Sequence, residues 1–352
     1  MRRKIQPDRG FRWISGVNPT YKSNLSVDMN DSTQTWYSLT PSGAVTLGNL
    51  TPVGQNSGQV GCRWPPNGHQ LAACINLPAR CQLWGPFWLH RRELYVPLPL
   101  PVYCLESDLD PETQLPDKIF RMHWQQGYWQ LRPEHRHQPI ETIGGRYLIE
   151  GSALAAFWSD GEQSPPHLQP FPWETLTLSR NRREQFQVAE EGGFFAEMTT
   201  LMHPGWSIAL LGFGEWEPPA WGQLGAGGTP VAIAPTRVRD SWLHRECPQA
   251  SGGILLTGAL WQQEGQTVSV PVPPVPMRGY AADLGIPWQS WKTVRDRRDR
   301  TQTVKVLTPG EWLTPAGAVY LWDGEPPMRR SQPLRDRYNR HVLGYGHLWL
   351  FE

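Results

Sequence analysis

The chain has 352 residues with 33 Lys or Arg against 32 Asp or Glu, and its formal net charge of +1 does not indicate a polycation that binds nucleic acid through its overall charge. An aromatic content of 11% excludes intrinsic disorder, the spread of 35 prolines excludes a long helix or coiled coil, and collagen is excluded because the sequence has no Gly-X-Y period. The 19 tryptophans instead predict a globular protein, rich in strands and loops, with a large aromatic core.

No membrane span or disulfide framework is expected. The most apolar stretch, residues 206–214, is under half the ~20 residues that cross a bilayer, and residues 1–9 are basic without the apolar segment of a secretory signal. The cysteines are odd in number and have no CxxC spacing, so we expect buried free thiols and a cytoplasmic protein. These cysteines are Cys62, Cys74, Cys81, Cys104 and Cys247.

The first third of the chain predicts an extension, a strand, a short helix and two hairpins. Residues 1–35 are polar and predict an N-terminal extension. Residues 36–40 predict the first strand, and residues 69–76 predict a short helix after the Trp64-Pro65-Pro66 turn. The hairpins are predicted at residues 87–96 and 119–131, the second turning at Gln126-Gly127.

The rest of the chain predicts mostly short strands. The apolar spacing in residues 146–158 predicts an amphipathic helix, and residues 159–173 predict a loop. Many short strands with a few short helices indicate the α+β class. The predicted strands cover residues 185–188, 193–198, 207–211, 231–233, 253–260, 304–307, 318–322 and 348–351, and residues 268–276 predict an extended edge or loop.

Charge is unevenly distributed along the chain. Residues 278–341 hold twelve Lys or Arg against seven Asp or Glu, whereas residues 1–277 hold twenty-one against twenty-four. Residues 291–300 alone carry five cations beside a tryptophan. The planar arginine fork matches phosphate, and aromatic rings stack on bases, so this third predicts a local nucleic-acid contact; a solvated loop of alternating charges is the alternative.

Enzyme signatures are weak. The sequence has no P-loop, HExxH or GxSxG motif, and His135-Arg136-His137 lacks the spacing of a helical metal site. His69, after the Pro-Pro turn, is a candidate general base for RNA cleavage. The alternative is that it has a structural role or contacts RNA. We therefore predict no catalytic residue, no metal and no cofactor.

Two glycine-rich turns adjoin strands, at residues 223–228 and 343–347. Glycine lets a backbone approach a ligand closely, and exposed N–H groups can hold phosphates. The alternative for each is a tight turn or bulge.

Several motifs then occur in a recognisable order. They are residues 36–41, Trp64-Pro65-Pro66-Asn67 with residues 69–73, Gly85-Pro86-Phe87 with residues 95–99, residues 224–228, residues 279–292, and Pro315-Ala316-Gly317-Ala318-Val319-Tyr320 followed by Gly344-Tyr345-Gly346. This ordered set, over residues 36–352, resembles the RAMP superfamily of CRISPR-associated proteins. More specifically, it resembles the RAMP subunit that caps the crRNA 5′ end in type III-B (Cmr) effector complexes. Residues 45–50 depart from the pattern, because they lack the arginine and aspartate of the family's Phe-Arg-Asp-Gly-type turn. This departure is consistent with a divergent type III-B or III-D member.

The resemblance implies two ferredoxin-like (RRM-type, RAMP) modules with long loop and β-hairpin insertions. The first would cover residues 36–240 and the second residues 241–352, ending in a Gly-rich loop. The implied function is that of a non-catalytic structural subunit of a type III CRISPR effector complex in antiviral defence. It would clamp the crRNA 5′ tag and dock the large polymerase-like subunit and the RAMP backbone subunits, meeting target RNA indirectly and no membrane.

The residues predicted to contact RNA combine the glycine loops with the basic third. They are Arg63, His69, Gly225, Gly227, Gly228, Trp291, Lys292, Arg295, Arg297, Arg298, Arg335, Arg337, Arg340, Gly344 and Gly346. Two alternatives remain open. One is a RAMP endoribonuclease that processes precursor crRNA with His69 as base, and the other is a carbohydrate-binding β-rich protein that uses tryptophan platforms.

Overall fold

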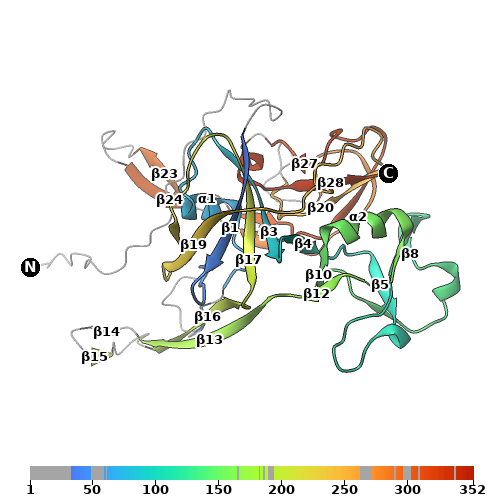
Figure 1. Cartoon of the computed structure of the whole chain (residues 1–352), viewed down its shortest axis with the longest axis horizontal. Helices are drawn as coiled ribbons and strands as arrows, with labels where there is room; N and C mark the ends of the chain where they lie inside the picture. The colour runs from blue at the N-terminus through green and yellow to red at the C-terminus, as the bar shows by residue number, and fades with distance from the viewer. Residues whose placement is uncertain are drawn as a thin grey trace, which may run out of the picture.

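The computed structural model describes residues 33–48, 59–60, 62–164, 166–181, 183–184, 187–188, 194–261, 272–288, 291–295, 303–307, 310–336 and 338–352. Within these residues the chain is mainly antiparallel β-sheet with two short α-helices (Figure 1). No helix in this part of the chain is both long and apolar enough to span a membrane.

The largest sheet has eight strands, all paired antiparallel, in the order β12-β10-β4-β3-β17-β1-β19-β18. β17 lies near its centre and is buried along almost its whole length, whereas β18 and β12 are the edge strands. The bounds are β1 (Gln34–Pro41), β3 (Gln82–His90), β4 (Glu93–Pro97), β10 (Tyr147–Glu150), β12 (Leu168–Pro170), β17 (Trp206–Phe213), β18 (Trp221–Leu224) and β19 (Thr229–Thr236).

The C-terminal part forms a five-stranded sheet in the order β21-β26-β20-β28-β27. Its last strand, β28, pairs antiparallel with β20 and is buried throughout. The bounds are β20 (Gly252–Leu255), β21 (Met277–Ala281), β26 (Val319–Trp322), β27 (Gln332–Pro333) and β28 (His347–Phe351).

Smaller sheets surround these two. They are a four-stranded sheet of β5 (Val102–Leu105), β6 (Ile119–Arg121), β9 (Ile140–Thr142) and β11 (Glu162–Gln163), and a three-stranded sheet of β2 (Gln59–Val60), β13 (Trp173–Asn181) and β16 (Phe194–Met202). The pairs are β7 (His123–Gln125) with β8 (Tyr128–Gln130), β14 (Arg183–Glu184) with β15 (Gln187–Val188), β22 (Ile286–Trp288) with β25 (Glu311–Leu313), and β23 (Trp291–Arg295) with β24 (Thr303–Leu307). Short 3-10 turns are η1 (Glu106–Asp108), η2 (Pro133–His135) and η3 (Arg340–Leu343).

Helix α1 (Gly68–Cys74) starts at a capping box. The Asn67 side chain accepts from the backbone N–H of His69 and Gln70, and the Gln70 side chain accepts from the backbone N–H of Asn67. Such reciprocal bonds satisfy N–H groups that the first turn leaves unpaired. The cap therefore fixes where α1 begins, and with it the position of His69.

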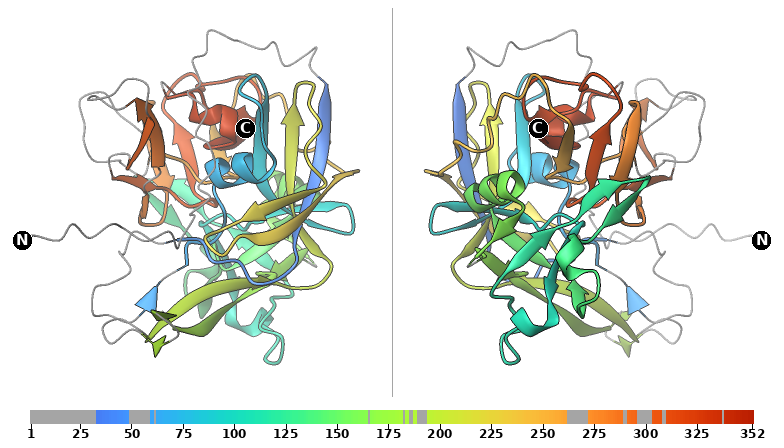
Figure 2. Two further views of the ribbon diagram at one scale, coloured as in Figure 1. Left: turned by 90° about the vertical axis from the view of Figure 1, so that its left-hand side faces the viewer. Right: turned by 90° about the vertical axis from the view of Figure 1, so that its right-hand side faces the viewer.

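The hydrophobic core crosses the predicted boundary between the two modules. Trp36 and Phe87 from the first part share one buried cluster with Val319, Trp349 and Phe351 from the second. In both views of Figure 2 the C-terminal segment lies against α1 and β3. The two parts are therefore packed as neighbours, while the boundary at 240/241 stays a prediction.

Most predicted elements are confirmed. Residues 36–40 lie in β1, residues 69–74 form α1, the hairpin at residues 87–96 is β3–β4, and the turn at Gln126-Gly127 joins β7 to β8. All five cysteines are free, four of them buried and Cys62 partly so. The predicted strands at 185–188 and 193–198, the segment at 268–276 and residues 1–32 of the extension lie wholly or partly outside the described residues.

Two predictions are wrong and one is not confirmed. Residues 147–150 form strand β10 rather than the first turn of a helix, and only Gly151–Asp160 is helical, as α2. The predicted loop over residues 159–173 contains the end of α2 and the strands β11 and β12. Ferredoxin-like modules are not confirmed. Strands β1 and β3, which α1 connects, lie on either side of β17 as in a split βαβ unit, but they belong to one eight-stranded sheet and not to a four-stranded module.

Candidate functional site

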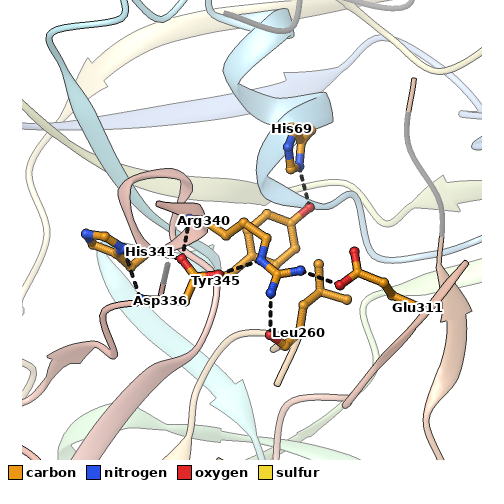
Figure 3. Close-up of polar contacts among 7 residues, drawn as sticks. All are labelled: His69, Leu260, Glu311, Asp336, Arg340, His341 and Tyr345. Atoms are coloured by element: carbon orange, nitrogen blue, oxygen red, sulfur yellow. Dashed lines mark hydrogen bonds and ion pairs between the residues drawn. The ribbon is translucent and has the colours of Figure 1, made fainter. Parts of the chain in front are cut away.

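The glycine-rich C-terminus meets the start of α1 at a buried polar junction built around Arg340 (Figure 3). Arg340 donates from Nε to Asp336 Oδ2 at 2.6 Å, from Nη1 to Glu311 Oε1 at 2.8 Å and from Nη2 to the Leu260 carbonyl oxygen at 2.9 Å. Its side chain is 8% exposed. Burial alone would lower the pKa of Arg340, but Asp336 and Glu311 raise it above its usual value. Arg340 is thus a buried, charged residue that holds the segments of Asp336, Glu311 and Leu260 together, and we call this its clamp role.

His69 lies on the other side of this junction. Its Nδ1 is 2.9 Å from the Tyr345 hydroxyl, and its ring packs against Trp288 and Tyr345. Burial, together with the nearby charge of Arg340, lowers the pKa of His69 to about 4. The imidazole is therefore neutral at pH 7 and engaged with the protein interior.

The loop at Gly344-Tyr345-Gly346 uses its backbone donors internally. The N–H groups of Gly344 and Gly346 donate to the carbonyl oxygens of His341 and Gly258. Gly344 has φ +79° and Gly346 φ +71°, a conformation that glycine adopts readily. A Cβ on Gly344 would also press on the Gly85 backbone, so this loop is a packed turn and not an open phosphate cradle.

The other glycine loop borders an open cleft of about 570 Å³. One wall is the C-terminal end of α1 and the other is edge strand β18 with the turn that leads into β19. Here too the N–H groups of Ala226 and Gly228 donate internally, to the carbonyl oxygens of Thr46 and Gly225. The lining residues are Ala73, Cys74, Asn76, Trp221, Gly222, Gln223, Gly225, Ala226, Gly227, Gly228 and Pro230.

A smaller cleft of about 250 Å³ lies beside the buried junction. Arg335 and Tyr338 are exposed at this cleft, and Gly346 and Trp261 also line it. The Arg340 guanidinium lies 5.1 Å from the centre of the Tyr338 ring. The cleft thus offers an exposed cation, Arg335, and an exposed ring, Tyr338, groups that suit a phosphate and a base respectively.

Helix α1 connects the two clefts. His69 at its start contacts Tyr345, which lines the smaller cleft, and Ala73 and Cys74 at its end line the larger one. Seven helical residues span ~10 Å. The two clefts therefore lie beside opposite ends of the same helix.

The remaining predicted RNA contacts are only partly described. Arg63 is partly buried, and burial lowers its pKa. Trp291, Lys292 and Arg295 lie on β23, of which the structure describes the backbone, whereas Arg297, Arg298 and Arg337 lie outside the described residues. No group of three or more metal-ligating side chains occurs in the described part of the chain.

The sequence reasoning missed Trp221. Its side chain is 63% exposed, more than any other tryptophan that the structure describes. Residues 221–224 are exposed, half-buried, exposed and buried in turn, so Trp221 shares the exposed face of β18 with Gln223. An apolar tryptophan on that face breaks the usual apolar–polar alternation, so the only local signals were the polar Gln223 and the glycine turn that follows.

Comparison with known proteins gives only remote structural likeness. No family model and no curated protein matches the chain. The solved structures that are similar include one titled as type III-B Cmr-beta bound to cognate target RNA, at 8% identity and a TM-score of 0.43 over 89% of this chain and 96% of that chain. Another is the Csm3–Csm4 subcomplex of a type III-A CRISPR-Cas interference complex, at 9% identity and a TM-score of 0.36 over 90% and 99%.

A third is a Csm1–Csm4 cassette in complex with cA4, at 10% identity and a TM-score of 0.31 over 84% of this chain and 88% of that chain. The chain is thus similar to chains of type III-B Cmr and type III-A Csm complexes. With each of these TM-scores below 0.5, the likeness by itself assigns neither fold nor function.

Proposed function

We propose that this protein is a non-catalytic RNA-binding subunit of a type III CRISPR RNA-guided effector complex. In this role it holds the 5′ tag of the crRNA and docks the large subunit and the backbone subunits. The proposal rests on the ordered sequence motifs and on one observation about them. Motifs that lie about 280 residues apart in the chain, the helix start at His69 and the Gly344-Tyr345-Gly346 turn, are in direct contact.

The contacts in this region favour a binding role over catalysis. A general base must reach the proton that it removes, with a pKa near the working pH. His69 packs between aromatic rings, and burial holds its pKa at about 4. We therefore favour the structural subunit over the endoribonuclease with His69 as base.

An exposed apolar surface supports a role within an assembly. Pro287 and Trp312 face each other across the β22–β25 pair, Trp312 is 42% exposed, and nearby Leu284 is 92% exposed. Exposed apolar groups of this kind are typical of protein–protein contacts. We assign this outer face to a neighbouring subunit.

The basic segment provides the test of RNA binding. The full-length chain is titrated against fluorescently labelled crRNA with its 5′ tag, at several salt concentrations. Replacing Lys292, Arg295, Arg297 and Arg298 with Ala should weaken binding and flatten the salt dependence. A single-stranded phosphate contact contributes about −0.7 to the slope of log K against log salt, so loss of all four should reduce it by about 3.

The matched control is Lys118→Ala, which removes one exposed cation from the other part of the chain. It should leave both affinity and slope unchanged. Equal binding of wild type and the quadruple variant at every salt concentration contradicts the assignment of this segment. Cleavage of repeat RNA by the purified protein, lost in His69→Ala, contradicts the non-catalytic role.

A further inference from the structure

Trp221 has an unusual position for so large an apolar side chain. It lies on the edge strand β18 and lines the larger cleft, yet it is 63% exposed. Among the described residues it makes no aromatic ring contact, whereas Trp36, Trp84 and Trp88 pack against other rings in the core. An indole left in water at a concave site is typical of a binding surface.

Strand geometry brings an amide beside the indole. Successive side chains of a strand alternate between its two faces, so Trp221 and Gln223 share one face, ~7 Å apart. Gln223 is exposed, and its side-chain amide lies beside Gly228 at the cleft. The other face carries Gly222, where a Cβ would overlap the Cys74 carbonyl oxygen of α1. The close packing on that face fixes the side from which Trp221 and Gln223 meet a ligand.

The cleft is uncharged. None of the described residues that line it has a charged side chain, and Cys74 is neutral because burial raises its thiol pKa. The N–H groups of Ala226 and Gly228 are already bonded to carbonyl oxygens. A phosphate finds neither a cation nor these donors here, whereas a flat, neutral, hydrogen-bonding ring finds a stacking surface on Trp221 and the amide of Gln223.

We infer that this cleft binds one unstacked base of single-stranded RNA, stacked on Trp221 with its edge toward Gln223. The inference rests on the proposed RNA-binding function and adds the residue and the chemical group that are recognised. Unstacked bases are recognised by aromatic stacking and by hydrogen bonds to their edges, and glutamine and asparagine amides pair well with an adenine edge. Recognition at this cleft is therefore independent of salt, in contrast to the phosphate contacts of the basic segment.

The test is a titration of the full-length chain with labelled crRNA at several salt concentrations. Stacking contributes ~1–3 kcal/mol per base, so Trp221→Ala should weaken binding about 5- to 150-fold, while Trp221→Phe keeps most of the affinity. The slope against salt should stay that of wild type. In a second titration, one nucleotide of the tag at a time is made abasic. Wild-type binding should weaken at one position, and at that position the abasic site should cause no further loss of affinity in Trp221→Ala.

A second variant probes the cleft without removing the ring. A Cβ on Gly227 meets no atom within 4 Å, so we expect Gly227→Val to fold and to narrow the cleft; it should weaken binding as well. Gly43→Val, at a position equally free of neighbours but outside the cleft, is the control. Thermal melting should show all of these variants folded.

The possible failures are distinguishable. If wild type binds no crRNA, the proposed function fails. If wild type binds crRNA and Trp221→Ala binds it equally well, the base site alone is overturned. A salt slope reduced by about 0.7 in Trp221→Ala would indicate a phosphate contact instead. Fluorescence quenching by oligosaccharides but not by RNA, seen in wild type and lost in Trp221→Ala, would indicate a carbohydrate site.

Discussion

At the scale of single residues, an arginine that the sequence suggests as an RNA contact is instead paired with carboxylates in the protein interior. Arg340 belongs to the arginine-rich third, yet it is paired with Asp336 and Glu311 in the interior. Asp336, four residues away, is a partner that the sequence could have suggested, but Glu311 is 29 residues away and arrives through the β22–β25 pair. We therefore leave Arg340 out of the proposed RNA surface.

Arg340→Met should destabilise the protein by about 3–5 kcal/mol, because it leaves two carboxylates in the interior without their cation. Arg239→Met is the matched control, since Arg239 pairs with Glu93 but its side chain is 81% exposed. The control should cost under about 1 kcal/mol. Equilibrium unfolding in denaturant measures both, and equal losses in the two variants would refute the clamp role of Arg340.

His347 predicts a loss of stability in acid. Its ring is fully buried against Trp84 and Phe87, neither nitrogen has a hydrogen-bond partner among the described residues, and burial lowers its pKa to about 3. The unfolded chain binds this proton near pH 6.5, so the free energy of unfolding is highest above that pH and falls below it. The fall is at most about 1.4 kcal/mol per pH unit for this group.

His347→Phe should remove this part of the pH dependence. The variant is expected to be at least as stable as wild type at pH 7 and clearly more stable at pH 5. His137→Gln, at an exposed position, should follow the wild-type profile. Denaturant unfolding at the two pH values measures the difference, and an unchanged pH dependence in His347→Phe would exclude His347 as its source.

At the scale of elements, local signals predicted α1 well and α2 poorly. The Pro-Pro turn and the Asn67 cap lie next to α1 in the sequence. In residues 147–158, apolar positions fit one helical stripe, but Leu148 and Ile149 pair with β4 and β12 instead. Helix α2 starts at Gly151, where a Cβ would overlap the Trp242 indole. The strand pairing of residues 148–149 and the packing of Gly151 both depend on segments distant in the chain, so a local sequence pattern could not predict them.

The start of α1 offers a sharp test of the junction. A Cβ on Gly68 would overlap the Leu343 carbonyl oxygen, so Gly68→Ala should separate α1 from the C-terminal turn and destabilise the protein by at least about 1 kcal/mol. Gly43→Ala, which meets no neighbour within 4 Å, should change stability by no more than about 1 kcal/mol. Thermal unfolding compares the two variants. A Gly68→Ala variant as stable as wild type would mean that the contact between Gly68 and Leu343 is not tight.

At the scale of the whole molecule, the net charge of +1 hides two different regions. The sequence located the basic third, the glycine turns and the motif order, while the neutral cleft at Trp221 emerged only when β18 met α1 across about 150 residues of chain. Nine of the tryptophans whose side chains the structure describes are buried, in keeping with the expected aromatic core. What the sequence could not supply is the pairing of distant segments that buries Arg340 and His69 and leaves Trp221 exposed.

The most direct test of the central claim is to sequence the RNA that co-purifies with the full-length chain, expressed together with its genomic neighbours and a CRISPR array. Our account predicts one discrete population of short RNAs whose 5′ ends begin in the repeat, lost when Lys292, Arg295, Arg297 and Arg298 are changed to Ala. Absence of RNA, or random fragments with no repeat-derived 5′ end, would contradict it.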